Sequence, residues 1–190
     1  MLSIYSQAVR AEEAQKSSSA WDRPWAFMIY SGVGSMTPLP EIIRFRNLEL
    51  TLDGVLSLGA EYRILSDRDA VSFGIETTLT QHLEEWGRVS VASAAMLRFH
   101  RPPWKVWFDS TFAVGNGLSY ASTPPEIEIR HLSRTSKLFY HLVFELTFNL
   151  KNTPEWEALF RIHHRSGIFG LFDGITGGSD FLCLGLRYRI

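Results

Sequence analysis

The chain has 190 residues, enough for a single domain with a sizeable core. Its 19 lysines and arginines nearly balance its 20 aspartates and glutamates. The net charge therefore does not favour binding to nucleic acid, and we expect no such partner. The single cysteine, Cys183, excludes an internal disulfide and cannot build a thiolate metal site alone. The sequence also lacks a run of about 20 apolar residues, so it predicts no transmembrane helix.

Residues 1–24 form a polar N-terminal segment with two interpretations. The stretch at 8–11, Ala-Val-Arg-Ala, loosely resembles a small-residue cleavage site, which indicates the remnant of a signal peptide whose apolar part lies upstream. The alternative is a flexible tail. Residues 25–190 are expected to form one domain.

From residue 25 onward, apolar and polar side chains alternate with the period of two that is typical of β-strands. In one such segment Val71, Phe73 and Ile75 face one way, while Ser72 and Glu76 face the other. No segment has a convincing helical period. Turn residues divide the alternation into eight predicted strands, at 25–34, 54–65, 70–82, 88–99, 104–120, 136–150, 155–166 and 180–190.

The connections between these strands alternate in length, which is typical of an up-and-down barrel in the bacterial outer membrane. Long loops are predicted at 35–53, 121–135 and 167–179, and shorter turns lie between them. We therefore predict an all-β fold, an eight-stranded antiparallel up-and-down transmembrane β-barrel, with both chain ends on the periplasmic side. Residue 166 would then lie at the external end.

Alternation alone does not say which face is outside, because a soluble ligand-carrying barrel has the same period with its apolar residues inward. Two features favour the membrane. Strands of about 11 residues suit a tilted span across a bilayer. The polar faces also carry charges of both signs, such as Glu61, Glu145, Arg161 and Arg187, which can pair inside a narrow lumen.

The mostly apolar face of strand 155–166 ends in His164 and Ser166, which point the same way at the outer-leaflet interface. A serine hydroxyl becomes a nucleophile when a neighbouring imidazole takes its proton, and the imidazole needs an acid to orient it. Asp180 shares the parity of the apolar face of the last strand and follows the 167–179 hairpin, so it is the preferred acid. Asp173, inside that loop, is the alternative.

Two further residues are candidates for substrate binding. The backbone N–H of Gly167 is unobstructed by a side chain and could donate to a developing oxyanion. Arg165 has two interpretations: a luminal ion pair, or a ligand for phosphate groups of a lipopolysaccharide.

The strand layout, with His-x-Ser high on the penultimate strand, resembles the lipid A 3-O-deacylase family of PagL-like outer-membrane barrels. The resemblance implies hydrolysis of an ester at the 3-position of lipid A without metal or cofactor, with His164 as base and Ser166 as nucleophile. The family's asparagine after the serine is replaced here by Gly167, and its glutamate has no counterpart. The acid role of Asp180 therefore rests on parity alone.

A non-enzymatic barrel is the main alternative, with its external loops serving adhesion, binding or envelope structure. In that interpretation His164 and Ser166 are interfacial polar residues, too far apart for a hydrogen bond. The expected partners are lipid A, or lipopolysaccharide, and outer-membrane lipid. A homodimer remains an open alternative to a monomer.

Overall fold

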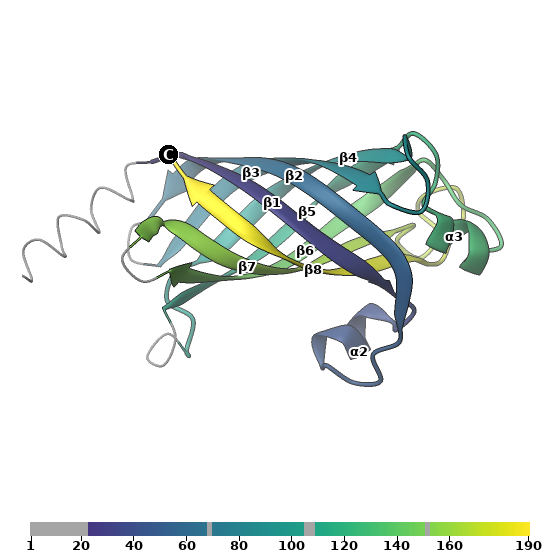
Figure 1. The fold of residues 1–190 in the computed structure, drawn as a ribbon, viewed down its shortest axis with the longest axis horizontal. Helices are drawn as coiled ribbons and strands as arrows, with labels where there is room; N and C mark the ends of the chain where they lie inside the picture. Colours follow the sequence, from purple (N-terminus) through teal and green to yellow (C-terminus); the bar gives the residue numbers. More distant parts are fainter. Residues whose placement is uncertain (1–22, 68–69, 105–108, 151–152) are drawn as a thin grey trace, which may run out of the picture.

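The computed structural model describes residues 23–67, 70–104, 109–150 and 153–190. Its strands form one closed barrel in which every strand runs antiparallel to its neighbours and the first pairs with the last (Figure 1). The eight-stranded antiparallel β-barrel predicted from the sequence is confirmed. The strands are β1 (Trp25–Ser35), β2 (Leu50–Ser66), β3 (Val71–His82), β4 (Val89–Phe99), β5 (Ser110–Ala121), β6 (Leu138–Leu150), β7 (Thr153–Ser166) and β8 (Gly178–Arg189).

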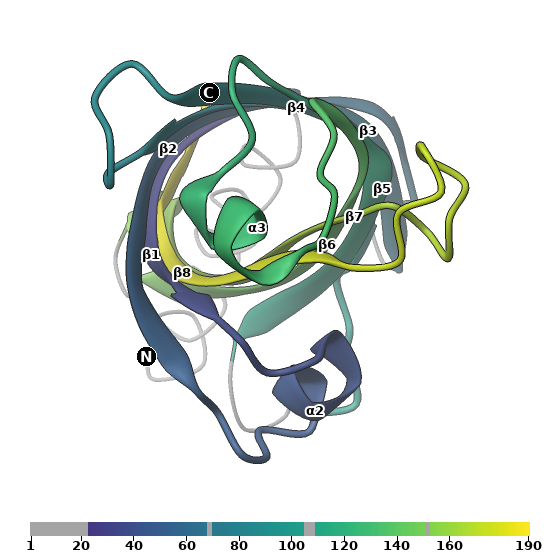
Figure 2. The same ribbon diagram turned by 90° about the vertical axis from the view of Figure 1, so that its right-hand side faces the viewer.

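Two short helices, α2 (Leu39–Ile43) and α3 (Glu126–His131), lie in long loops where the sequence predicted no helix. With 5 and 6 residues, each is too short to show a helical period. The β1–β2 loop carries α2 outside the barrel wall, whereas the β5–β6 loop folds α3 over the external mouth (Figure 2). Strand β5 also begins at Ser110, later than the predicted 104, and residues 105–108 lie outside the described ranges.

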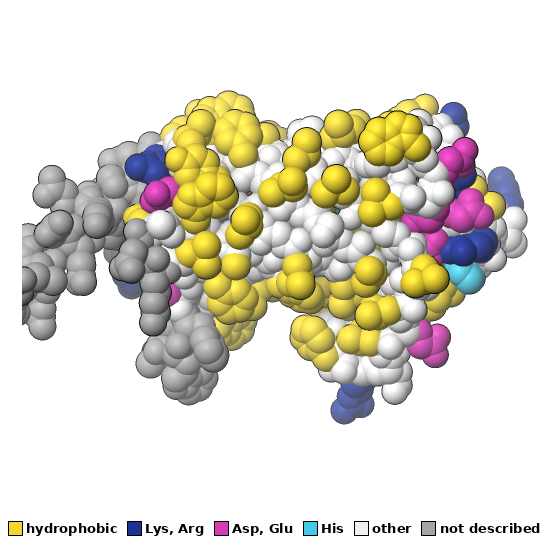
Figure 3. All heavy atoms as spheres, viewed as in Figure 1, with side chains coloured by type: hydrophobic (Ala, Val, Ile, Leu, Met, Phe, Trp, Pro, Cys, Tyr) yellow, Lys and Arg dark blue, Asp and Glu magenta, His cyan; other side chains and the backbone are white. Residues whose placement is uncertain are grey.

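The barrel wall is apolar outside and polar inside. On β1, Phe27 and Ile29 are exposed on the outer face, while Met28 and Tyr30 between them are buried. Figure 3 shows hydrophobic side chains spread along the flank of the barrel and the charged ones of this view mostly at its ends. An apolar exterior with a charged interior is the reverse of a soluble carrier, so this is a barrel of the bacterial outer membrane.

No helix within the described ranges has the length and apolar character needed to cross a bilayer.

A network of ion pairs occupies the lumen of the barrel. Arg161 donates to Glu76 at 2.5 Å and also contacts Glu145. Arg98 bridges Glu145 at 2.6 Å and Glu61 at 3.0 Å. The chain of contacts continues through Arg187 to Glu157 and ends at Arg189. Each of these groups is buried, so opposite charge and hydrogen bonding must replace the water that it loses on folding.

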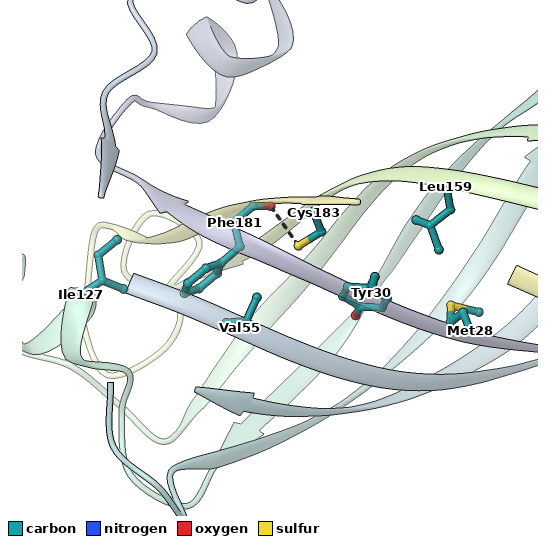
Figure 4. Packing of buried hydrophobic residues seen from close by; sticks show 7 residues of the cluster. All are labelled: Met28, Tyr30, Val55, Ile127, Leu159, Phe181 and Cys183. Atoms are coloured by element: carbon teal, nitrogen blue, oxygen red, sulfur yellow. Dashed lines mark hydrogen bonds between the residues drawn. The ribbon is translucent and has the colours of Figure 1, made fainter. Parts of the chain in front are cut away.

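A cluster of buried hydrophobic residues starts beside Arg161, at Met28 and Tyr30, and extends to Ile127 of α3 at the external mouth (Figure 4). Ile127 of α3 enters the cluster, which also holds Phe181 of β8. Through Ile127, α3 is therefore part of the barrel core. The cluster consists of Met28, Tyr30, Val55, Ile127, Leu159, Phe181 and Cys183.

We expect Arg161→Ala to destabilise the barrel by about 3–5 kcal/mol, because it leaves two buried glutamates without their shared cation. Urea unfolding in detergent micelles, followed by tryptophan fluorescence, measures the change. Arg44→Ala is the control, since the Arg44 pair with Glu41 is solvent-exposed and such pairs contribute less than about 1 kcal/mol. Equal effects of the two substitutions would show that the luminal network does not stabilise the fold.

Candidate active site

The outer face of β7 carries His164 and Ser166 at the external end of the barrel. Their odd-numbered neighbours His163 and Arg165 are buried on the luminal side, so the period of two directs the pair outward. In the register of β7 with β8, His164 lies opposite Asp180 and Ser166 lies opposite Gly178. The hairpin therefore brings the histidine and the aspartate together on one face.

The His164 ring and the Asp180 carboxylate form a hydrogen bond, with 2.8 Å between Nδ1 and Oδ1. Because an ionised carboxylate only accepts, Nδ1 carries the proton and Nε2 is left free to act as a base. The two side chains are 15% and 10% exposed, so the pair is largely shielded from solvent. The expected pairing of His164 with Asp180 is present, while its catalytic role stays a prediction. The alternative acid, Asp173, lies in the exposed part of the β7–β8 loop.

Ser166 is not hydrogen-bonded to the His164 ring in the part of the chain that the structure describes. The two residues are separated by one residue on the same strand, which places their Cα atoms about 7 Å apart. Contacts between nucleophile and base are often long in unliganded enzymes and shorten when the substrate binds. His164 and Ser166 thus lie on the same face of β7, as a catalytic dyad requires, but they do not form a hydrogen bond with each other.

A groove of about 680 Å³ runs over this part of the outer wall. Tyr140 and Leu142 of β6 lie beside Ser166 and His164 in the strand register and belong to its lining. Residues 36–40 form part of one wall, and residues 168–169 of the β7–β8 loop contribute another. The site is therefore a largely apolar channel with His164, Ser166 and Asp180 among its lining residues.

Residues 36–48, which we call the lobe, project from the end of β1 beside the His164–Asp180 pair. Ser35, the last residue of β1, is the strand partner of Asp180. Thr37 closes the base of the lobe, because its hydroxyl donates to the carbonyl of Asn47 at 2.8 Å and accepts from the backbone N–H of Glu49 at 2.8 Å. This wall of the groove is thus hydrogen-bonded into a fixed shape.

The lobe also contacts the barrel directly. The centre of the Phe45 ring lies 6.2 Å from that of Phe160, which is on the outer face of β7. Aromatic pairs at this spacing attract one another beyond the area they bury. The contact holds the lobe against the strand that carries the candidate residues.

The backbone N–H of Gly167, predicted to donate to an oxyanion, has an acceptor within the protein. It already donates to the carbonyl of Gly177, at 2.9 Å. A Cβ atom at this position would overlap the carbonyl oxygen of Ile175, so glycine is required here by close backbone packing. This N–H is therefore already hydrogen-bonded within the β7–β8 loop.

Arg165 does not reach the groove either. It lies on the luminal face, buried, where its guanidinium donates to the carbonyls of Ser136 and Lys137 at 2.8 and 2.9 Å. The same parity that turns His164 and Ser166 outward turns Arg165 inward. Of its two interpretations from sequence, the geometry fits the luminal ion pair, with Glu128 of α3 as the partner at 3.5 Å.

Glu128 is a residue of this region that the sequence did not single out. Burial raises the pKa of its carboxyl above the ordinary value, against the opposing effect of the Arg165 guanidinium. The sequence contained no helical signal for α3, so nothing indicated that this glutamate would enter the lumen. Tyr140 and Leu142, by contrast, could have been found by pairing β6 with β7 in an antiparallel register.

We expect Asp180→Ala to remove the low-field proton resonance of His164 Nδ1–H, because the substitution deletes the acceptor of that hydrogen bond. Proton NMR of the barrel in detergent micelles, with ¹⁵N-labelled histidine, measures it. Asp173→Ala is the matched control and should leave the resonance in place. If Asp173→Ala removes the resonance and Asp180→Ala does not, the acid has been assigned to the wrong residue.

A scan against protein-family models and a search of curated proteins found no match. Among solved structures, the chain is similar to the outer membrane enzyme PagL, with a TM-score of 0.57 and 11% identity over 86% of this chain and 99% of that one. It also resembles the N-terminal β-barrel domain of Pseudomonas aeruginosa OprF (TM-score 0.49, 11% identity, 88% and 98% covered). A third is Neisserial surface protein A (TM-score 0.47, 11% identity, 87% and 96% covered). At this identity the likeness shows a shared fold, the small outer-membrane barrel, and does not by itself show an enzyme.

Proposed function

We propose that this protein is an outer-membrane serine esterase that removes an acyl chain from lipid A at the outer leaflet. In this proposal Ser166 is the nucleophile, His164 is the general base and Asp180 orients the histidine. The observation that carries the proposal is the 2.8 Å hydrogen bond between His164 and Asp180, on the lipid-facing side of the wall and one residue from a serine. A bilayer-facing surface rarely carries such a polar pair without a function.

The chemistry follows the usual course of acyl transfer. His164 Nε2 takes the proton of the Ser166 hydroxyl as Oγ attacks the ester carbonyl, and Asp180 stabilises the imidazolium that forms. The tetrahedral intermediate collapses, the C–O bond to the sugar breaks, and His164 returns the proton to the departing alkoxide. Water, deprotonated by His164, then attacks the acyl-serine and releases a fatty acid.

The groove supports a lipid as the substrate. Its walls are mainly apolar, and its lining includes His164 and Ser166 of the outer face of β7. An acyl chain could therefore enter from the leaflet without first crossing water. The 3-position of lipid A, as the ester cleaved, is implied only by the resemblance to PagL-like deacylases.

The oxyanion of the tetrahedral intermediate needs a donor other than Gly167, whose N–H already has an acceptor. Tyr140 is our candidate. It is the strand partner of Ser166 on β6 and lines the same groove. The hydroxyl of a tyrosine side chain can donate a hydrogen bond to such an oxyanion and so form part of an oxyanion hole.

A non-enzymatic role in adhesion, binding or envelope structure is the second candidate. It is favoured by the lack of a hydrogen bond between Ser166 and the His164 ring in the described part of the chain, since a catalytic dyad must form that bond at least when substrate binds. In that case the groove would hold membrane lipid without cleaving it.

We expect Ser166→Ala to lower the rate of lipid A deacylation by about 10³-fold or more, because it removes the attacking oxygen. Mass spectrometry of lipid A from cells that express wild type or variant measures the acyl chains retained. Ser93→Ala is the control, since Ser93 lies on the outer face of β4, three strands away. Identical acylation with wild type and Ser166→Ala would reject the esterase and favour the second candidate.

A further inference from the structure

The luminal side of the wall directly behind His164 and Asp180 is held by its own set of polar contacts. On the same two strands, Arg165 is the register partner of Ser179, one position along from the His164–Asp180 partners. Because successive side chains alternate, these two residues point into the lumen. Whatever fixes Arg165 and Ser179 therefore also fixes the backbone that carries the outer pair.

Glu128 of α3 connects those two luminal residues. Its carboxyl accepts from the Ser179 hydroxyl at 2.8 Å and lies 3.5 Å from the Arg165 guanidinium. A third contact comes from the hydroxyl of Thr135, at 2.9 Å. Glu128 is 0% exposed, so water does not compete for these bonds. One side chain thus links β7 and β8 at the level of the candidate site.

β6 is joined to the same arrangement. Arg165 donates to the carbonyls of Ser136 and Lys137, and its guanidinium lies 4.8 Å from the centre of the Phe139 ring. The ring of His141 lies 3.2 Å, through Nδ1, from the backbone carbonyl of His164 itself. The backbone around His164 is therefore restrained from the lumen as well as by the strand ladder.

We propose that Glu128 is a positioning residue for the active site: from inside the barrel it sets the relative placement of His164 and Asp180 outside. This inference rests on the proposed function for its prediction about hydrolysis, whereas its prediction about the NMR resonance of His164 does not require the protein to be an esterase. Glu128 itself does not line the groove, although Ile127, His131 and Leu132 of the same loop do. The route we propose is through its contacts with Arg165 of β7 and Ser179 of β8. Catalytic geometry is sensitive to such support, because a displacement of about 1 Å can cost about 10²-fold in rate.

A purely structural role for Glu128, as an anchor of α3, is the competing explanation. The helix already has other anchors: Arg88 binds Glu126 at 3.0 Å, and Arg130 binds Asp53 on β2. Ile127 is also packed into the luminal cluster. Glu126→Ala is therefore a matched control that removes a glutamate and an ion pair from the same helix without touching Arg165 or Ser179.

We expect Glu128→Ala to shift or broaden the His164 Nδ1–H resonance and to lower kcat about 10-fold to 100-fold, with KM within about two-fold of wild type. Glu128→Gln keeps an oxygen acceptor for Ser179 and should retain most of both signals. The measurements are histidine proton NMR in micelles and lipid A hydrolysis in mixed micelles. Glu126→Ala should leave both unchanged.

The proposal is overturned if Glu128→Ala behaves like Glu126→Ala in the NMR measurement. If the resonance responds but wild type and Ser166→Ala release no fatty acid, the esterase assignment fails while the positioning role stands. If Glu128→Ala does not fold, which the loss of heat-modifiable migration on gels would show, Ser179→Ala replaces it. That variant removes one hydrogen bond from the same carboxyl and should shift the resonance in the same direction, and an unchanged resonance would overturn the proposal.

Discussion

The fold depends on one constraint: a charged side chain on a strand must face the lumen, because the other side of the wall is hydrocarbon. Since strand side chains alternate, this constraint fixes the direction of every residue once a few are placed. On β7 it sends Arg161, His163 and Arg165 inward. His164 and Ser166 are then left on the lipid side, where polar side chains are costly. The carboxylate of Asp180, which lies opposite His164 on the same outer face, is an exception to that rule, and this is why the pair points to function.

At the level of His164, the outer and luminal faces of strands β7 and β8 carry different groups. Outside, His164 and Asp180 meet beside an apolar groove; inside, Glu128 joins the strands that carry them. Both long loops near the site extend this arrangement. The lobe follows Ser35, the strand partner of Asp180, and α3 carries Glu128 into the mouth. External loops thus contribute both to the lining of the groove and to the contacts behind it.

The parts of this structure that were predictable from sequence are those with a repeating pattern. Period-two alternation identified the strands, the facing of His164 and Ser166, and Asp180 as the aspartate opposite His164. Helices α2 and α3 have no such pattern, being too short for one, so the groove wall and Glu128 could not be found. The use of the Gly167 N–H by Gly177 depends on how the β7–β8 loop closes, which no local signal encodes. The luminal position of Arg165 was predictable, because odd-numbered residues of β7 lie on the opposite face from His164 and Ser166.

The luminal ion pairs also bear on how the chain is assembled. Arg187 of β8 reaches Glu61 of β2, and Arg161 of β7 reaches Glu76 of β3, so the partners come from opposite ends of the sequence and from strands that are not neighbours. A sheet of the first six strands would hold Glu76 without Arg161, and it would leave Arg98 as the shared partner of Glu61 and Glu145. An open intermediate in the bilayer would therefore carry uncompensated charge against lipid. These pairs thus favour insertion of a nearly complete barrel, in which β7 and β8 bring the arginines that pair with the glutamates of β2 and β3.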